Sequence, residues 1–276
     1  MIPTFLKWAG GKRKILDKID PFIPNEINDY YEPFLGGGSV FFYIKQKYNP
    51  KNCVISDINK DLINTFIDVR DNPQHVIKHL KKFKENNSEE HYYYIRSLFN
   101  KGKISGTKRS AAFIYLNKTC YNGLYRVNSK NEFNVPYGKY KNPEVFNEET
   151  ILYASELLQG TTIKCQDYEE LKETVEKGDF IYLDPCYDPL KKTSFAHYTP
   201  KKFSSEDNER LAKFVAEMNR RGAKILFSNN ITKNIKKYYK EGEGFSREII
   251  KSFRSVGSRK NYRGFFDEYL IRNFSN

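Results

Sequence analysis

Apolar and polar positions along the chain form two kinds of pattern, short apolar runs and longer amphipathic stretches. The runs at 30–34, 52–57, 161–165, 180–183 and 223–228 are typical of central strands in a parallel sheet. Amphipathic patterns from about residue 39 and over 60–70 predict helices between the first three runs. We therefore predict an α/β fold in which a mostly parallel sheet carries helices on both faces.

Local signals mark where some later elements begin and end. Ser204 and Asp207 have the spacing of a capping box, which predicts the start of a helix. The tail over 247–273 predicts two antiparallel strands on either side of a basic loop at 254–263. The end of the chain is therefore expected to add an antiparallel part to the sheet.

Residues 73–149 depart from this alternation. Charged helical patterns come first, and two stretches rich in turn formers and aromatics follow, CYNGLYRVNSK at 120–130 and FNVPYGKY at 133–140. Neither stretch has the spacing of a buried helix or strand. We interpret the segment as an inserted, mainly helical domain with an exposed loop or hairpin, set between the two parts of the sheet domain, 1–72 and 150–276.

The balance of basic and acidic residues bears on what the protein binds and says nothing about its fold. Lys and Arg number 47 against 34 Asp and Glu, which gives a formal net charge of +13 in a chain of 276 residues. Two interpretations stay level. The composition either serves solubility and reflects an AT-rich coding genome, or it provides a basic face that neutralises the phosphates of a polyanionic partner.

The four cysteines indicate neither a metal site nor a disulfide framework. They lie far apart, without a CxxC pair or a histidine at ligand spacing. The N-terminus lacks the apolar stretch of a leader, and no apolar run approaches the roughly 18 residues that span a membrane. We expect a soluble, cytoplasmic protein with no metal and no membrane partner, associated with the nucleoid if the source is bacterial.

A glycine-rich turn follows the first predicted strand. In Glu32-Pro-Phe-Leu-Gly-Gly-Gly38 the backbone can approach a ligand closely, at the start of a helix that favours polar groups. Asp57 ends the next predicted strand, where an acid can accept hydrogen bonds from ribose hydroxyls. An adenosine-type cofactor is one interpretation of this pair. An ordinary turn and a helix N-cap at Asp57 are the structural alternatives.

The N-terminal segment FLKWAGGK, residues 5–12, holds the only tryptophan of the chain together with two glycines and two lysines. A terminal segment of this kind is often disordered. Its aromatic, small and basic residues equally suit a segment folded over a nucleotide-like cofactor.

The tetrad Asp184-Pro185-Cys186-Tyr187 follows the apolar run at 180–183, at the edge where ligands bind in open α/β sheets. An exocyclic amine conjugated to an aromatic ring is a poor nucleophile. A carboxylate and a backbone carbonyl that accept its two N–H bonds localise its lone pair, and a nearby aromatic ring holds the base by stacking. The tetrad suits such an amine, while a plain strand-end turn is the structural alternative.

Five motifs occur in this order along the chain: KWAGGK, EPFLGGG, SDIN, YNGLYRVN with FNVPYGKY, and DPxY. Taken together, they make the chain resemble the Dam-type DNA adenine-N6 methyltransferases of the α arrangement, from about Lys7 to Phe274. The resemblance implies a Rossmann-like methyltransferase sheet with an inserted DNA-recognition domain that carries a β-hairpin. It implies S-adenosylmethionine as cofactor and double-stranded DNA as partner. The implied reaction is methyl transfer to N6 of a flipped adenine, in a short G-containing site such as GATC.

The resemblance also implies roles for single residues. Asp184 and the carbonyl of Pro185 would bind the target N6, with Tyr187 stacked on the adenine. Arg126 would contact guanine, which agrees with the bidentate pairing of arginine with guanine O6 and N7. The residues implied to enclose the cofactor are Trp8, Ala9, Gly10, Lys12, Phe34, Gly36, Asp57 and Asp167. Those implied to bind DNA are Tyr121, Asn122, Leu124, Arg126, Asn134, Pro136 and Tyr140.

Cys186 departs from the family tetrad, which has a second proline at this position. Proline stiffens the turn, so cysteine loosens it at a cost of roughly 0.4–1 kcal/mol. The three groups expected to contact the base are all retained. No histidine or other base stands near Cys186 in the sequence to activate it as a nucleophile.

Three other functions stand as alternatives. Methyltransferases of RNA or protein use similar tetrads, although the insertion with Arg126 argues against them. Cys186 makes a DNA-binding module without catalysis a second alternative. A dinucleotide-dependent oxidoreductase is disfavoured, because the glycine turn lacks the GxGxxG pattern. The sequence leaves open the recognition sequence, the oligomeric state (a monomer included), and a restriction–modification, housekeeping or phage role.

Overall fold

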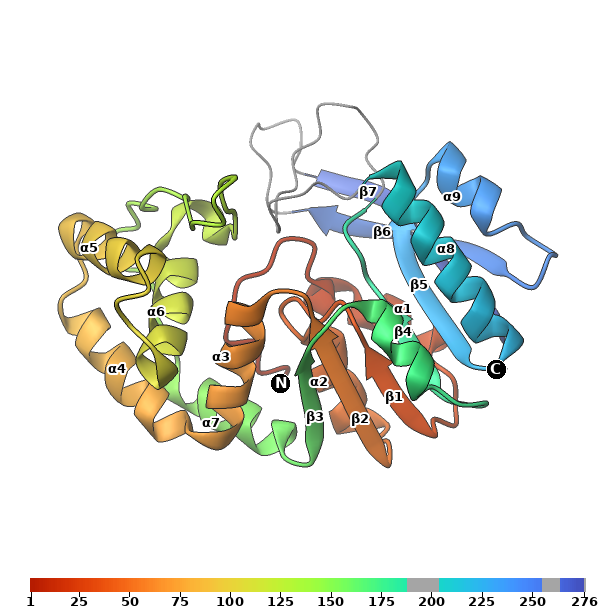
Figure 1. Ribbon diagram of the computed structural model, residues 1–276, viewed down its shortest axis with the longest axis horizontal. Helices are drawn as coiled ribbons and strands as arrows, with labels where there is room; N and C mark the ends of the chain where they lie inside the picture. Colours follow the sequence, from red (N-terminus) through yellow and green to blue (C-terminus); the bar gives the residue numbers. More distant parts are fainter. Residues whose placement is uncertain (188–203, 255–263, 276) are drawn as a thin grey trace.

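A seven-stranded sheet in the order β3-β2-β1-β4-β5-β7-β6 organises the molecule (Figure 1). The computed structural model describes residues 1–187, 204–254 and 264–275. The first five strands are parallel, and β7 runs antiparallel to both β5 and β6. The predicted mostly parallel sheet is therefore confirmed. Its strands are β1 (Asp29–Glu32), β2 (Asn52–Asp57), β3 (Thr161–Cys165), β4 (Phe180–Leu183), β5 (Lys224–Asn230), β6 (Ser246–Arg254) and β7 (Gly264–Arg272).

The two faces of the sheet pack into two separate cores, because successive side chains of a strand point to opposite faces. Tyr30 and Tyr182 lie in one core, and their neighbours Tyr31 and Ile181 lie in the other. The first core includes α2 (Ser39–Lys47), α3 (Lys60–Asp71) and α7 (Glu148–Leu158). The second is covered by α8 (Ser205–Arg220), α9 (Lys233–Tyr238) and the 3-10 helix η4 (Tyr168–Glu173). Helices on both faces are thus confirmed.

Three helices form a unit beside the β3 edge of the sheet, at the left of Figure 1. They are α4 (Pro73–Glu85), α5 (Glu89–Asn100) and α6 (Gly106–Thr119). After α6 comes the short 3-10 helix η3 (Tyr121–Gly123), and the chain then doubles back through the antiparallel bridges Cys120–Tyr137 and Val127–Phe133. The predicted hairpin is present as isolated bridges rather than as two continuous strands. Because buried residues of this unit join the first core, the domain boundaries at 73 and 149 stay a prediction.

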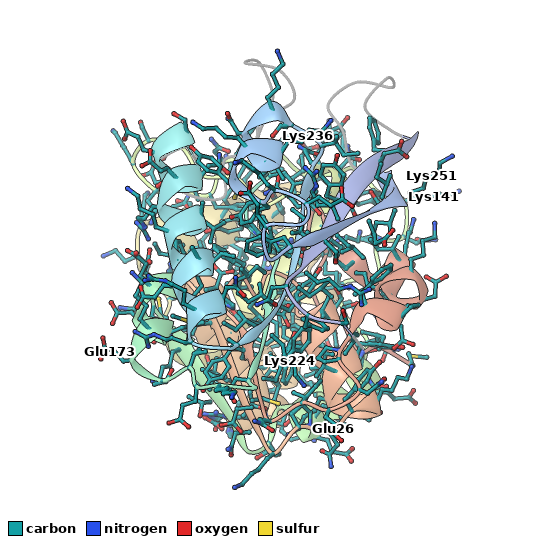
Figure 2. All side chains as sticks on the ribbon, turned by 90° about the vertical axis from the view of Figure 1, so that its right-hand side faces the viewer. Glu26, Lys141, Glu173, Lys224, Lys236 and Lys251 are labelled. Atoms are coloured by element: carbon teal, nitrogen blue, oxygen red, sulfur yellow. The ribbon has the colours of Figure 1, made fainter. Side chains whose placement is uncertain are left out.

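The segment before β1 packs against the sheet through short helices. It contains η1 (Lys12–Ile15), α1 (Leu16–Ile19) and η2 (Asp20–Phe22), whose side chains include the buried Ile15 and Ile19. Lys224, at the start of β5, donates to the carbonyl of Glu26 over 2.8 Å, and both residues are labelled in Figure 2. Phe5 and Leu6 are also buried, so the N-terminal segment is folded onto the protein, and of the two alternatives for this segment disorder is wrong.

Several predicted boundaries are confirmed and two are corrected. The capping box of Ser204 and Asp207 starts α8 as expected. The first strand ends at Glu32 rather than at Phe34, because Pro33 has no N–H to donate to the ladder. The N-cap of α3 is Asn59, whose side chain accepts from the Leu62 amide, so the alternative role of Asp57 as N-cap is wrong.

The predicted antiparallel pair at the end of the chain is confirmed as β6 and β7. Most of the basic loop expected between them, residues 255–263, lies outside the described residues. None of the helices in the described ranges combines the length and the apolar character that a membrane crossing requires.

Candidate active site

The site lies where the strand order of the sheet reverses. β1 and β4 are neighbours, but β2 and β3 continue on one side and β5 on the other. Ligands of open α/β sheets bind in the crevice that this reversal opens at the carboxyl ends of the strands. The cleft found there has a volume of about 1660 Å³. This exceeds the roughly 300–1,000 Å³ of a usual small-molecule pocket, and it leaves space for more than one ligand.

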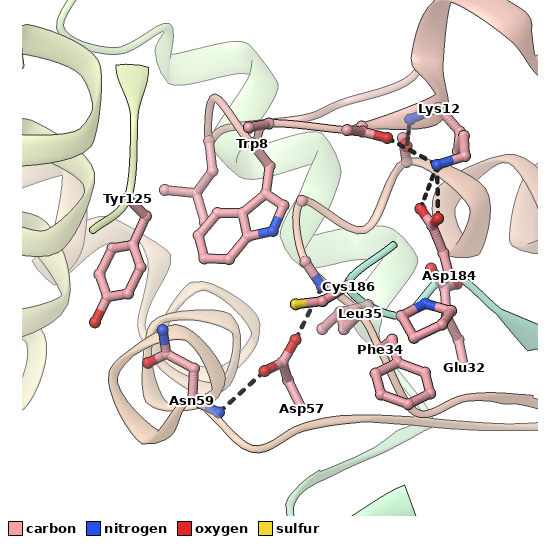
Figure 3. Close-up of a pocket in the computed structure, with 18 of the residues that line it drawn as sticks. Trp8, Lys12, Glu32, Phe34, Leu35, Asp57, Asn59, Tyr125, Asp184 and Cys186 are labelled. Atoms are coloured by element: carbon pink, nitrogen blue, oxygen red, sulfur yellow. Dashed lines mark hydrogen bonds and ion pairs between the residues drawn. The ribbon is translucent and has the colours of Figure 1, made fainter. Parts of the chain in front are cut away.

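The glycine turn after β1 is shaped by Trp8. Gly36 has φ +49°, and a Cβ at this position would lie 2.7 Å from Cδ1 of the indole. Only glycine fits there, because both the backbone conformation and the approach of the ring exclude a side chain. The indole also stacks on the Tyr125 ring, with the ring centroids 5.5 Å apart and the ring planes at 18° (Figure 3). Trp8 therefore connects the turn to the segment that follows α6.

Asp57 closes the same turn from the end of β2. Its carboxylate accepts the amide of Gly36 over 3.1 Å and that of Asn59 over 3.0 Å, as Figure 3 shows. Burial raises the pKa of Asp57 above its usual value. A carboxylate can accept about four hydrogen bonds, so these two amides leave lone pairs available for a ligand. The geometry fits an acid that binds the hydroxyls of a ribose.

Phe34, Asp167 and Tyr168 together line one wall of the cleft. The Tyr168 ring packs against Phe34 with 5.3 Å between centroids. Asp167 accepts the amide of Glu169 over 3.0 Å and forms an ion pair with Arg210 of α8. Arg210 also donates to the Tyr168 hydroxyl over 2.8 Å. Arg210 was missed by the sequence analysis, because it lies in an amphipathic helix without a motif.

Lys12 lies against the tetrad rather than along the glycine turn. Its ammonium is 2.6 Å from both carboxylate oxygens of Asp184 and 2.9 Å from the carbonyl of Gly10. It also lies 4.9 Å from the centre of the Tyr187 ring. Figure 3 shows the contact with Asp184. The assignment of Lys12, Ala9 and Gly10 to the cofactor, which came from the resemblance, stays a prediction, and all three line the cleft.

The pKa of Asp184 is set by two opposing effects. Burial raises it above its usual value, and the ammonium of Lys12 lowers it. Two further carboxyl groups line the cleft, Glu32 at the end of β1 and Glu268 on β7, both 2% exposed. Burial raises the pKa of Glu32 to about 8, although its Oε2 accepts the Tyr30 hydroxyl over 2.7 Å. Sequence analysis gave neither group a function.

Cys186 is half-buried in the tetrad, and burial raises the pKa of its thiol to about 12. The thiolate is the nucleophilic form of cysteine, so a thiol held protonated at neutral pH is inert. The structure agrees with a packing role for Cys186. Within residues 1–187, 204–254 and 264–275, no three His, Cys, Asp or Glu side chains are grouped as metal ligands.

The residues expected to bind DNA all lie in the hairpin region after α6. Arg126 is exposed, and its Nε donates to Oδ1 of Asn134 over 2.7 Å. Tyr121 is 45% exposed, and its amide donates to the carbonyl of Pro136 over 2.8 Å. Asn122 has φ 57° within η3. Leu124 and Tyr140 are half-buried in the same region.

Asn117 of α6 joins this region to the N-terminal segment and was missed by the sequence analysis. Its side chain accepts the amide of Lys7 and donates to the carbonyl of Lys7, both over 2.8 Å. It also donates to the carbonyl of Gly123 over 3.3 Å. Asn117 is 1% exposed, so the segment before Trp8 is attached to the hairpin region after α6 by a buried side-chain amide.

Comparisons with known proteins agree with this site. A family model described as D12 class N6 adenine-specific DNA methyltransferase matches residues 8–256. The type II methyltransferase M.MjaIII of Methanocaldococcus jannaschii is 43% identical, over 99% of both chains. The DNA adenine methylase of Haemophilus influenzae is 36% identical, over 94% of this chain and 89% of its own. That of Escherichia coli is 33% identical, over 97% of this chain and 94% of its own.

The chain belongs to the D12 class of N6 adenine-specific DNA methyltransferases. The predicted family and enzyme class are thereby confirmed, and the oxidoreductase and the module without catalysis lose their support.

Proposed function

We propose that this enzyme transfers a methyl group from S-adenosylmethionine to N6 of an adenine in duplex DNA, within a short site such as GATC, after the base has been flipped out of the helix. The observation that carries the proposal is the position of Asp184. Its carboxylate lies in the cleft where the strand order reverses, opposite the glycine turn and Asp57. Cofactor and target base would thus meet in one cleft.

The cofactor part of the cleft has the side chains that an adenosine-containing molecule requires. Asp57 has lone pairs for ribose hydroxyls, and the Trp8 indole covers the turn at Gly36. Phe34 and Asp167 would line the remainder, with Arg210 holding Asp167 in place. When bound, S-adenosylmethionine supplies a methyl group activated by its sulfonium.

The target part of the cleft activates the amine through hydrogen bonds. Asp184 and the Pro185 carbonyl would accept the two N–H bonds of N6, and Tyr187 would hold the base by stacking. As N6 gains positive charge, the carboxylate stabilises it at close range in a partly buried site. The Lys12 ammonium lies 2.6 Å from both oxygens of Asp184, and each oxygen keeps a lone pair that could accept an N–H of the entering amine.

Flipping the base costs a few kcal/mol, which contacts to the duplex have to offset. The basic composition and the exposed Arg126 supply candidates for such contacts. Arg126 would read a guanine of the site, and Tyr121, exposed at η3, could wedge into the opened base step. The names of the relatives, type II methyltransferase and DNA adenine methylase, leave a restriction–modification and a housekeeping role as two outcomes.

The test is transfer of labelled methyl to a GATC duplex and to a duplex in which the adenine is replaced. Wild-type protein should label the first alone, and an RNA duplex should not be labelled. Asp184→Ala should abolish transfer while calorimetry still detects S-adenosylmethionine binding. Asp17→Asn removes an exposed acid of α1 and serves as the matched control. Turnover like that of the wild type in Asp184→Ala would contradict the assignment.

A further inference from the structure

A hydrogen bond joins the aromatic ring of the tetrad to the antiparallel part of the sheet. The Tyr187 hydroxyl donates to Oε2 of Glu268 over 2.8 Å. Tyr187 lies in the turn after β4, whereas Glu268 lies on β7, opposite Asn230 of β5. The bond therefore links the turn after β4 to β7, which is the second strand from β4 in the sheet order. The two residues are 81 apart in the sequence.

The Tyr187 ring is held at its tip and contacted on its face. Burial, together with the charges of Asp184 and Glu268, raises the pKa of Tyr187 well above its usual value. The hydroxyl thus keeps its proton and remains a donor. On the ring face, the Lys12 ammonium lies 4.9 Å from the centroid. The phenol oxygen lies on the axis of χ2, so the hydrogen bond fixes the position of the ring tip, while the Lys12 ammonium contacts the ring face.

Glu268 is poorly placed to stabilise the fold. Its side chain is 2% exposed, and its other oxygen, Oε1, is buried and has no hydrogen-bond partner within residues 1–187, 204–254 and 264–275. A buried carboxylate oxygen without a partner destabilises a protein, and the Asp184 carboxyl in the same cleft adds repulsion. The presence of a carboxylate at this position is therefore better explained by its hydrogen bond to Tyr187 than by a contribution to stability.

We propose that Glu268 is a positioning residue of the target-base pocket. By accepting the Tyr187 hydroxyl, it holds the tip of the ring on which the flipped adenine stacks at a set place in the cleft, so that N6 faces Asp184. The inference rests on the proposed function, since the stacking role of Tyr187 belongs to it. Glu268 acts through Tyr187 and does not itself have to touch the base.

The experiment compares methyl transfer to the GATC duplex by four variants at saturating S-adenosylmethionine. Glu268→Ala should lower kcat by about tenfold, because it removes the hydrogen bond to Tyr187. Tyr187→Phe should lower kcat at least as much, because it removes that bond and also the contact of the hydroxyl with Asp184. The double variant should lose no more than Tyr187→Phe alone, since Glu268 acts through the hydroxyl that this variant lacks. Glu268→Gln retains an oxygen that can accept the hydroxyl and should keep most of the activity.

Two further measurements separate positioning from a structural role. Glu268→Ala should not lower the unfolding temperature and should keep the cofactor affinity of the wild type, because it removes a buried oxygen that has no partner within the described residues. Asp267→Asn, an exposed neighbour on β7, is the matched control and should keep the wild-type rate.

The proposal is overturned if Glu268→Ala keeps the wild-type rate, if the two single losses multiply in the double variant, or if Glu268→Gln loses as much as Glu268→Ala. A lower unfolding temperature that parallels the loss of rate would likewise overturn it. Failure of the proposed function looks different. In that case the wild type itself transfers no methyl to adenine in DNA, and both proposals fall together.

Discussion

The ammonium of Lys12 is bound 2.6 Å from both carboxylate oxygens of Asp184, although 172 residues separate the two along the chain. The Lys12 side chain is 4% exposed and that of Asp184 is 19% exposed, so the pair is largely withdrawn from water. A buried charge is costly without its partner. The Lys12 ammonium therefore favours the ionised form of Asp184, which is the form that the proposed activation of the target amine requires.

The first prediction concerns the pH dependence of Lys12→Met. Burial raises the pKa of Asp184 and the Lys12 ammonium lowers it, so removal of the ammonium leaves burial unopposed. The pKa of Asp184 should rise further, and the acidic limb of the kcat profile should move to higher pH. Single-turnover rates at saturating cofactor, measured across roughly pH 5.5–9, report this limb.

Lys51→Met is the matched control, because Lys51 is exposed in the turn before β2. It should reproduce the wild-type profile. A Lys12→Met profile that is lower in rate but unchanged in its acidic limb would show that Lys12 does not act on Asp184.

The second prediction concerns stability and Glu32. Burial raises its folded-state pKa to about 8, above the ordinary value of 4.5 that the unfolded chain retains. Between these values the folded state holds a proton that the unfolded state has released. The free energy of unfolding of the wild type should therefore fall as the pH rises toward 8. Glu32→Gln cannot ionise, and it should gain more than about 1 kcal/mol on the wild type over this range.

Urea unfolding at three pH values would measure this difference. Glu26→Gln, which changes an exposed acid near the same strand, should follow the wild type at each pH. If Glu32→Gln and the wild type keep a constant difference from acidic to alkaline pH, Glu32 is not the buried proton-binding group that the structure indicates.

The third prediction separates backbone strain from cofactor binding at Gly36. Gly36→Ala and Gly102→Ala both place a side chain at positive φ, +49° and +64°, and this backbone strain alone should cost each variant about 1 kcal/mol of stability. The alanine Cβ at 36 would also meet the Trp8 ring at 2.7 Å, whereas nothing lies within 4 Å at 102. Gly36→Ala alone should therefore weaken S-adenosylmethionine binding, by about tenfold or more.

Trp8 is the only tryptophan, so its fluorescence reports this turn directly. Titration with S-adenosylmethionine should change the emission of the wild type and of Gly102→Ala at the same concentrations. Equal affinities of the two glycine variants would show that the Trp8 contact has no part in the cofactor site.

The sequence could predict those parts of the site that lie at the ends of central strands. Asp184 and Asp57 each follow a short apolar run, and parallel strands bring such ends to one edge of the sheet. The turn at Gly36 was found for the same reason. The alternation of short apolar runs with amphipathic helices also predicted helices on both faces of the sheet. Tyr30 and Tyr31 accordingly belong to different cores.

The sequence could not predict contacts that depend on how distant side chains meet. Glu268 lies in a tail strand without a motif, and its link to Tyr187 requires the order β4-β5-β7. Arg210 reaches Asp167 only because α8 crosses the second face of the sheet. The contact of Lys12 with Asp184 could likewise not be predicted, because neither the sequence pattern nor the resemblance shows in which direction a long side chain points.

The last prediction concerns the reading of guanine by Arg126. Its Nε donates to Asn134, which orients an exposed guanidinium on the hairpin. A bidentate contact of arginine with guanine discriminates against other bases by about 1–3 kcal/mol. Arg126→Ala should therefore lower kcat/KM on GATC by roughly 10- to 100-fold while hardly changing it on a duplex whose guanine is replaced. Lys130 is exposed on the same hairpin. Lys130→Ala should weaken the binding of both duplexes alike and should reduce the salt dependence of that binding. An equal loss on both duplexes for Arg126→Ala would place Arg126 on the phosphate backbone and assign the reading of guanine to another residue.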